Sequence, residues 1–195
     1  MMISSPLILH FPSSMLITDD QFFDFCRENR ELRIERNQFG DILIMSPVDS
    51  ETGNREFHII GQLSVWSEKD GTGIGFSSNT GFKLSRGAER SPDAAWIKLA
   101  RWNKLTSAQQ KKFAPICPDF VIELRSASDD LQPLKEKIQE YMQEPGIQLG
   151  LLIDRKNCRV YIYRPQEKEK YLENPDTVNC DPVLSRFVLN MSKIW

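Results

Sequence analysis

The sequence has few of the residues that zinc centres and histidine-dependent hydrolases need. Its 195 residues include two histidines, His10 and His58, and four cysteines scattered without a CxxC pair. A structural zinc site needs closely spaced Cys or His ligands, and a nucleophilic hydrolase needs a base beside its nucleophile. The spacing in this chain suits neither, which argues against both classes of protein. We interpret the cysteines as reduced thiols and expect a cytoplasmic protein.

Long apolar runs and a strong basic charge are lacking as well. No run approaches the roughly 20 apolar residues that a membrane-spanning helix needs, and residues 1–11 do not form a convincing signal peptide. We therefore expect no membrane partner. The net charge of −2 and the sequence pI of about 5.8 argue against a dedicated high-affinity DNA-binding surface. A local basic groove beside an acidic metal site remains compatible with both values.

The length and composition fit one ordinary globular domain. With 195 residues, of which 40% are hydrophobic and 27% charged, the chain can bury a substantial core. Thr18 and Gln21 match a capping box, which predicts the start of a helix. We predict a single domain over residues 1–195, with an N-terminal helix-hairpin unit at about 18–46. A C-terminal tail at about 164–195 is expected to cover the sheet.

Two apolar segments, each opened by a Pro-Asp pair, are the most informative part of the chain. One runs from Asp93 to about Leu99, and the other from Asp119 to about Ser126. Short apolar runs bounded by turn residues are typical of buried strands. Asp119 would lie about 13 Å along the second strand from Glu123, at about 3.3 Å per residue, so we expect it to be a turn residue.

Glu123 is the unusual residue of the second strand, because an unpaired buried carboxylate costs several kcal/mol. Residues two apart on a strand share a face, so Arg125 is predicted to point the same way and could form an ion pair with Glu123. Asp93 offers an alternative explanation, because it would lie at one end of a neighbouring strand. Two carboxylates that close together repel, and a divalent cation such as Mg²⁺ compensates them through oxygen ligands.

The chain also contains a recognisable set of short segments. They are Ile44-Met45-Ser46-Pro47, Glu51-Thr52-Gly53-Asn54-Arg55, Arg90-Ser91-Pro92-Asp93, Cys117-Pro118-Asp119-Phe120-Val121-Ile122-Glu123-Leu124-Arg125-Ser126, Lys137-Ile138-Gln139-Glu140-Tyr141 and Leu152-Ile153-Asp154. Together they resemble the Uma-type family of endonucleases in the PD-(D/E)XK superfamily, over nearly the whole chain. The resemblance implies an α/β (α+β) fold of the restriction-endonuclease-like kind, in which helices flank a mixed sheet.

The resemblance also implies a metal site and its ligands. Asp93 and Glu123 would hold Mg²⁺ (or Mn²⁺), and the backbone carbonyl of Leu124 would be a further ligand. A helix expected to be capped by Ser50 and to end near Lys69 carries two secondary candidates, Glu51 and Glu56. A helix before the core sheet often carries an additional acid near the metal in this superfamily. Acids in a first turn can also simply complement the helix dipole.

The catalytic cation departs from the superfamily pattern, because Arg125 stands where the lysine is usual. In the Uma-type family the lysine has moved to the following helix, and Lys137 matches that position. On that helix Lys135 and Lys137 lie on opposite borders of the apolar stripe, so the spacing alone does not choose between them. Arg125 stays protonated at any working pH. Lys137 could serve as a base if burial and a metal lowered its pKa.

The function implied by the resemblance is metal-dependent hydrolysis of phosphodiester bonds, with DNA as the expected partner. Asp93, Glu123 and Lys137 would be the catalytic residues. A homodimer is expected, because cutting both strands of a duplex is simplest for a symmetric pair. The alternative is a non-catalytic homodimeric nucleic-acid-binding or accessory module that keeps the nuclease fold.

Overall fold

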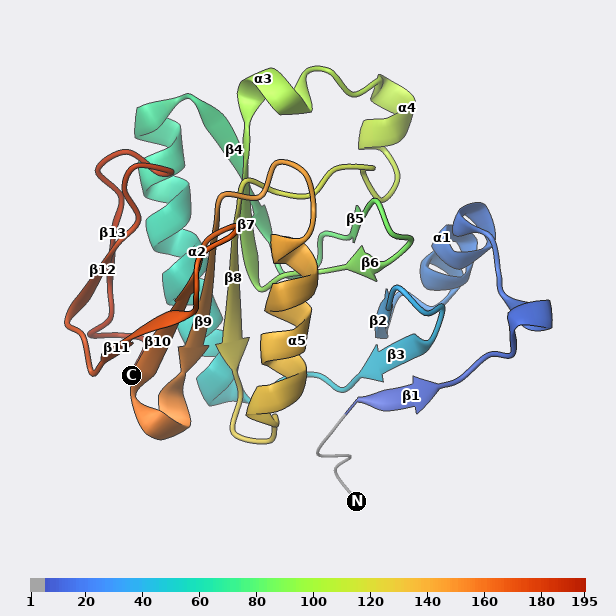
Figure 1. Ribbon diagram of the computed structural model, residues 1–195, viewed down its shortest axis with the longest axis horizontal. Coiled ribbons are helices and arrows are strands. Elements are labelled where there is room, and N and C mark those ends of the chain that lie inside the picture. The colour runs from blue at the N-terminus through green and yellow to red at the C-terminus, as the bar shows by residue number, and fades with distance from the viewer. Residues whose placement is uncertain (1–5) are drawn as a thin grey trace.

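A six-stranded mixed sheet lies at the centre of the computed structural model, which describes residues 6–195 (Figure 1). Its strand order is β11-β10-β9-β8-β7-β4, and only β8 and β9 pair in parallel. The helix α5 (Leu131–Met142) connects these two parallel strands, as a crossover must. The strands are β4 (Gly73–Ser77), β7 (Ala94–Lys98), β8 (Phe120–Arg125), β9 (Leu149–Asp154), β10 (Arg159–Tyr163) and β11 (Lys170–Glu173).

Each face of the sheet packs against its own helix, because alternate residues of a strand point to opposite faces. Phe120, Ile122 and Leu124 of β8 pack on the side of α2 (Ser50–Asp70), whereas Val121 packs with α5. The α2 N-cap is Asp49 rather than the predicted Ser50. The Asp49 carboxylate accepts hydrogen bonds from both the backbone N–H and the hydroxyl of Thr52, which satisfies a free donor of the first turn.

A second, smaller sheet lies beside α5, on the right of Figure 1. Its strand order is β1-β3-β2-β6-β5, and α1 (Asp19–Glu28) packs on it through the fully buried Phe22. The predicted capping box between Thr18 and Gln21 is present. The elements of this sheet are β1 (Leu7–Leu9), β2 (Arg33–Arg36), β3 (Ile42–Met45), β5 (Phe82–Lys83) and β6 (Glu89–Arg90), with a short 3-10 helix η1 (Ser13–Met15) before α1.

Residues 178–194 pack against the face of the central sheet that α2 covers. The Phe187 ring lies 5.4 Å from that of Trp66 in α2, and the Trp66 indole N–H donates to the Ser185 carbonyl. Val178 and Leu189 of the paired strands β12 (Thr177–Asn179) and β13 (Val188–Asn190) are fully buried there. The remaining short helices are α3 (Leu99–Trp102), α4 (Ser107–Gln110) and η2 (Arg155–Asn157).

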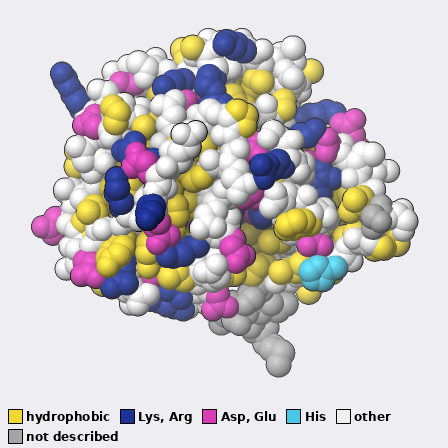
Figure 2. Space-filling model, in the orientation of Figure 1, with side chains coloured by type: hydrophobic (Ala, Val, Ile, Leu, Met, Phe, Trp, Pro, Cys, Tyr) yellow, Lys and Arg dark blue, Asp and Glu magenta, His cyan; other side chains and the backbone are white. Residues whose placement is uncertain are grey.

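The surface carries charges of both signs. Figure 2 shows Lys and Arg side chains interspersed with Asp and Glu over the visible face, in keeping with the small net charge. Within the described residues, none of the helices combines the length and the apolar character that crossing a bilayer requires.

Candidate active site

Asp93 and Glu123 come together at one end of the central sheet. The antiparallel register pairs Ala94 of β7 with Ile122 of β8, so the next residues along, Asp93 and Glu123, are neighbours just beyond the paired segment. The backbone N–H of Leu124 donates to the Asp93 carboxylate over 2.7 Å. Both acids are buried, with 6% and 1% of their surface exposed. Two neighbouring strands therefore each contribute one carboxylate, as the sequence predicted.

Lys137 of α5 is the cation that pairs with Glu123. Its Nζ lies 2.9 Å and 3.1 Å from the two carboxylate oxygens, and the hydroxyl of Tyr141, one turn further along α5, donates to the same carboxylate. Lys135 instead lies over the ring of Tyr161 and pairs with Glu169. The structure thus distinguishes two lysines that the periodicity of the helix left equivalent.

Arg125 does not pair with Glu123, so the predicted strand-end ion pair is wrong. Its guanidinium bonds Asp154 of β9 over 2.9 Å and the Asp129 carbonyl over 3.1 Å. The parallel register places Arg125 opposite Asp154, and that carboxylate is fully buried. Arg125 and Glu123 share a face of β8, as the strand alternation predicts. Arg125 nevertheless pairs with Asp154 of the neighbouring strand β9.

Two residues of β2, Arg33 and Glu35, complete the charge arrangement, and the sequence did not assign either to the site. Arg33 Nη2 donates to Asp93 over 3.0 Å, and Glu35 accepts from Lys137 Nζ over 2.8 Å. The alternation of Leu32 to Glu35 places these two side chains on one strand face. Nothing in that pattern indicated that α5 and Asp93 would lie against this face.

Neighbouring charges shift the pKa values of the buried residues Glu35 and Lys137. Burial raises the pKa of Glu35, but Lys137, Arg90 and Arg33 outweigh it and hold that pKa below its ordinary value. Burial alone would lower the pKa of Lys137, yet Glu123 and Glu35 raise it above its ordinary value. Without a metal, the charges of Glu123 and Glu35 thus outweigh burial and favour the protonated, hydrogen-bond-donating form of Lys137. A lowering of this pKa by a bound metal stays a prediction.

The carboxylate of Glu123 is less well compensated. Burial raises the pKa of Glu123, Lys137 opposes the shift, and the negative charges of Asp93 and Glu35 add to it. Glu56 of α2 shows the same effect, because burial and the charge of Asp93 raise its pKa to about 7. Burial is the main cause of both shifts and the charge of Asp93 adds to each, so a cation bound beside Asp93 would favour the ionised forms of both acids.

The two secondary acids of α2 lie in different surroundings. Glu56 is close enough to Asp93 to sense its charge. Glu51 is 63% exposed and pairs with Arg55 over 2.7 Å and with Arg155 over 3.3 Å. Glu56 is therefore the better placed of the two for a role beside Asp93.

The chemistry of the donors fits a hard divalent cation. An ionised carboxylate can accept about four hydrogen bonds, and Asp93 accepts two from its protein partners, Arg33 and the Leu124 N–H. Oxygen lone pairs therefore remain for Mg²⁺, which takes carboxylate, carbonyl and water ligands. Within residues 6–195, no three Asp, Glu, His or Cys side chains are grouped closely enough to hold a metal by themselves. A metal bound at Asp93 would therefore need ligands besides these acidic side chains, such as backbone carbonyls or water.

Asp119, at the start of β8, takes no part in this site. It is fully buried, accepts hydrogen bonds from the Lys98 backbone and Gln148, and pairs with Arg101 over 2.7 Å. It lies at the opposite end of β8 from Glu123 and ties the loops at that end together. Asp119 thus lies at a bend just before β8, where the sequence predicted a turn. The sequence did not indicate its ion pair with Arg101.

Comparisons with known proteins bear on the family and the fold of the chain. Residues 19–192 match the model of the Uma2 family, described as "Putative restriction endonuclease". The structure is similar to that of a protein from Anabaena variabilis ATCC 29413, described as a putative nuclease belonging to DUF820, with a TM-score of 0.70. The two chains are 18% identical, and the match covers 84% of this chain and 90% of the other. The predicted fold class is confirmed. No curated protein matches the sequence.

Proposed function

The chain belongs to the Uma2 family, and from this premise we propose that it is a Mg²⁺-dependent endonuclease that hydrolyses phosphodiester bonds in DNA. The observation that carries the proposal is the meeting of Asp93, Glu123 and Lys137 at one end of the sheet. They come from two adjacent strands and the helix that crosses between β8 and β9. A cytoplasmic location and a homodimeric state belong to the same proposal.

Each residue has a distinct role in this reaction. Asp93, Glu123 and the Leu124 carbonyl would hold Mg²⁺, which supplies charge neutralisation at the phosphate and activates water. The charges of Glu123 and Glu35 raise the pKa of Lys137, and its Nζ contacts both acids, so in this proposal it donates a hydrogen bond to the attacking water or to the charge that develops on the phosphate. Arg33 holds Asp93 in place through Nη2. Glu56 is a candidate for a further contact with the metal or its water.

We expect purified protein to cut plasmid or linear duplex DNA when Mg²⁺ or Mn²⁺ is added and to stop when EDTA removes the metal. Asp93→Asn and Glu123→Gln should each lower the cleavage rate at least about 100-fold, because each removes charge that the metal site needs. Nicking and linearisation can be followed by gel electrophoresis, with circular dichroism as a check on folding.

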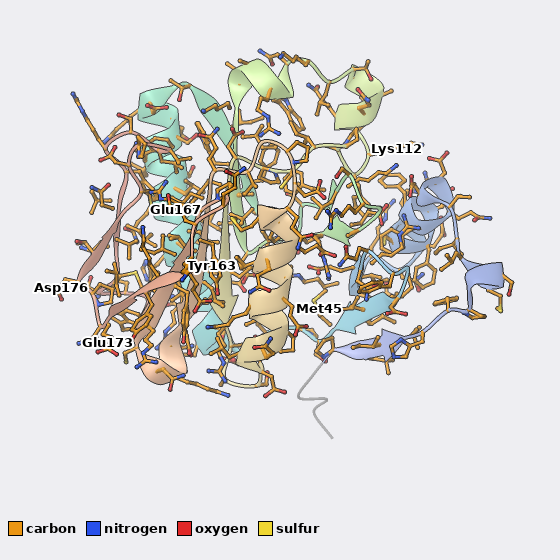
Figure 3. All side chains as sticks on the ribbon, viewed as in Figure 1. Met45, Lys112, Tyr163, Glu167, Glu173 and Asp176 are labelled. Atoms are coloured by element: carbon orange, nitrogen blue, oxygen red, sulfur yellow. The ribbon has the colours of Figure 1, made fainter. Side chains whose placement is uncertain are left out.

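Asp176→Asn and Glu167→Gln are the matched controls, because both side chains are exposed and lie on the tail side of the central sheet in Figure 3. They should cleave at the wild-type rate. An absence of cleavage by the wild-type protein with either metal, on duplex DNA, single-stranded DNA and RNA, would contradict the proposal. It would support the non-catalytic accessory module instead.

The homodimer is a separate prediction. A single compact chain presents one set of Asp93, Glu123 and Lys137, whereas a duplex has two strands to cut, so a two-fold pair suits the substrate. Light scattering coupled to size-exclusion chromatography should give about twice the chain mass of 22.6 kDa at micromolar concentration. A monomer mass throughout that range would refute it.

A further inference from the structure

Arg33 has hydrogen-bonding capacity that the protein does not use. Both of its hydrogen bonds to other residues, to the Ser91 carbonyl over 2.7 Å and to Asp93 over 3.0 Å, come from Nη2. Its Nε is buried, and no acceptor among the described residues meets it. A buried donor without a partner costs about 1–3 kcal/mol. The protein therefore accepts this cost at Nε, and Nη1, which makes no hydrogen bond to a described residue and is not among the buried atoms without a partner, can take a further acceptor.

The position of Arg33 makes that donor relevant to the site. Arg33 pairs across the hairpin with Met45, which Figure 3 labels at the end of β3 nearest α5. Its guanidinium is close enough to Glu35 and Glu123, as well as to Asp93, to sense their charges. The side chain is 23% exposed, so solvent reaches part of it while the carboxylates keep it oriented.

Lys137, which contacts two of these acids, is engaged differently. Its Nζ is shared among Glu35, Glu123 and the Ser91 carbonyl, so its three donors all have partners in the protein. Arg33 differs because only Nη2 anchors it, Nε is buried, and Nη1 makes no hydrogen bond to a described residue. A guanidinium presents paired N–H groups that match two oxygens of a phosphate.

We propose that Arg33 binds a backbone phosphate of the nucleic acid, with Asp93 and the Ser91 carbonyl fixing its orientation. This inference takes its substrate class, nucleic acid, from the proposed function. It adds Arg33 as a residue that contacts this substrate. The second sheet thereby contributes a substrate contact to a site otherwise built from the central sheet and α5. Arg33 would hold the phosphate next to Asp93 and Glu123. Its own positive charge would offset the repulsion between those two acids and the DNA.

The test measures binding rather than cleavage. A fluorescently labelled short DNA duplex is titrated by anisotropy at several salt concentrations, once in Ca²⁺ and once in EDTA. Arg33→Met should weaken binding about tenfold, the loss of one charged hydrogen bond. The slope of log K against log salt should become shallower by about 0.9, the value for one phosphate contact on duplex DNA. A residue with a merely structural role would not change that slope.

Two further variants keep the test decisive. Arg159→Met is the matched control, because Arg159 also pairs with a carboxylate, that of Glu173, which lies far from Met45 in Figure 3. It should retain wild-type affinity and slope. Arg33→Lys keeps a cation beside Asp93, so it should fold as the wild type does. It should still bind more weakly, because a single ammonium engaged by Asp93 and Ser91 has no fork left for a phosphate.

The outcomes separate this inference from the proposed function. If Arg33→Met binds with wild-type affinity and slope while the wild-type protein cleaves DNA, the role of Arg33 is refuted and the endonuclease stands. If binding depends on Arg33 and no cleavage occurs with Mg²⁺ or Mn²⁺, the phosphate contact stands and the endonuclease fails. If the wild-type protein binds no duplex even at low salt, both are overturned.

Discussion

Replacing Lys137 by alanine is expected to lower the rate of DNA cleavage by about 10²–10³-fold, the usual loss when one donor to the transition-state charge is removed. Lys137 Nζ is the cation in contact with Glu123. Lys135→Ala is the matched control, because Lys135 lies on the same helix but pairs with Glu169. Initial rates on the same duplex, with metal in excess, check the prediction.

Folding must be measured beside activity, because Lys137→Ala leaves Glu35 and Glu123 buried without their common cation. Removing one partner of a buried pair typically costs about 3–5 kcal/mol, so this variant should unfold at a lower denaturant concentration. Lys137→Arg separates the two effects. It keeps the charge between the two acids and should recover most of the stability, but its planar fork cannot take the position of the Lys137 ammonium. Cleavage by Lys137→Ala at the wild-type rate would show that the assignment is wrong.

The second large effect is on stability, and it concerns Arg125. Arg125→Ala should lower the free energy of unfolding by about 3–5 kcal/mol, the usual cost of leaving a buried charge without its partner. The charge left behind is that of Asp154, which is fully buried and accepts from Arg125 over 2.9 Å. Urea denaturation followed by tryptophan fluorescence measures the change.

Arg159→Ala is the control for Arg125→Ala, because it removes an arginine from an exposed ion pair with Glu173. Such pairs contribute little to stability, so its urea midpoint should stay close to that of the wild type. A double variant, Arg125→Leu with Asp154→Leu, should recover part of the loss, since replacing both members of a buried pair by apolar residues removes the unpaired charge. If Arg125→Ala unfolds at the wild-type midpoint, the Asp154 pair does not stabilise the fold.

Local signals in the sequence were sufficient for the elements that carry the two acids. The Pro-Asp pairs before Ala94 and Phe120 opened strands β7 and β8 as predicted. The side-chain alternation of a strand places Glu123 on the same face of β8 as Val121, and α5 covers this face. The capping box predicted at Thr18 begins a helix in the structure. These features depend on neighbours a few residues apart, which the linear order of the chain already specifies.

The tertiary structure alone decided which charges meet. Lys137 and Lys135 were equivalent by helical spacing, and only the approach of Glu35 and Glu123 distinguishes them. Arg125 pairs with a residue 29 positions away, and Arg33 reaches Asp93 across 60 positions. Buried charges must find partners wherever the fold brings them within hydrogen-bond reach. The packing of β2 and α5 against the central sheet decides which charged side chains come within this reach. No local pattern in the chain encodes that packing.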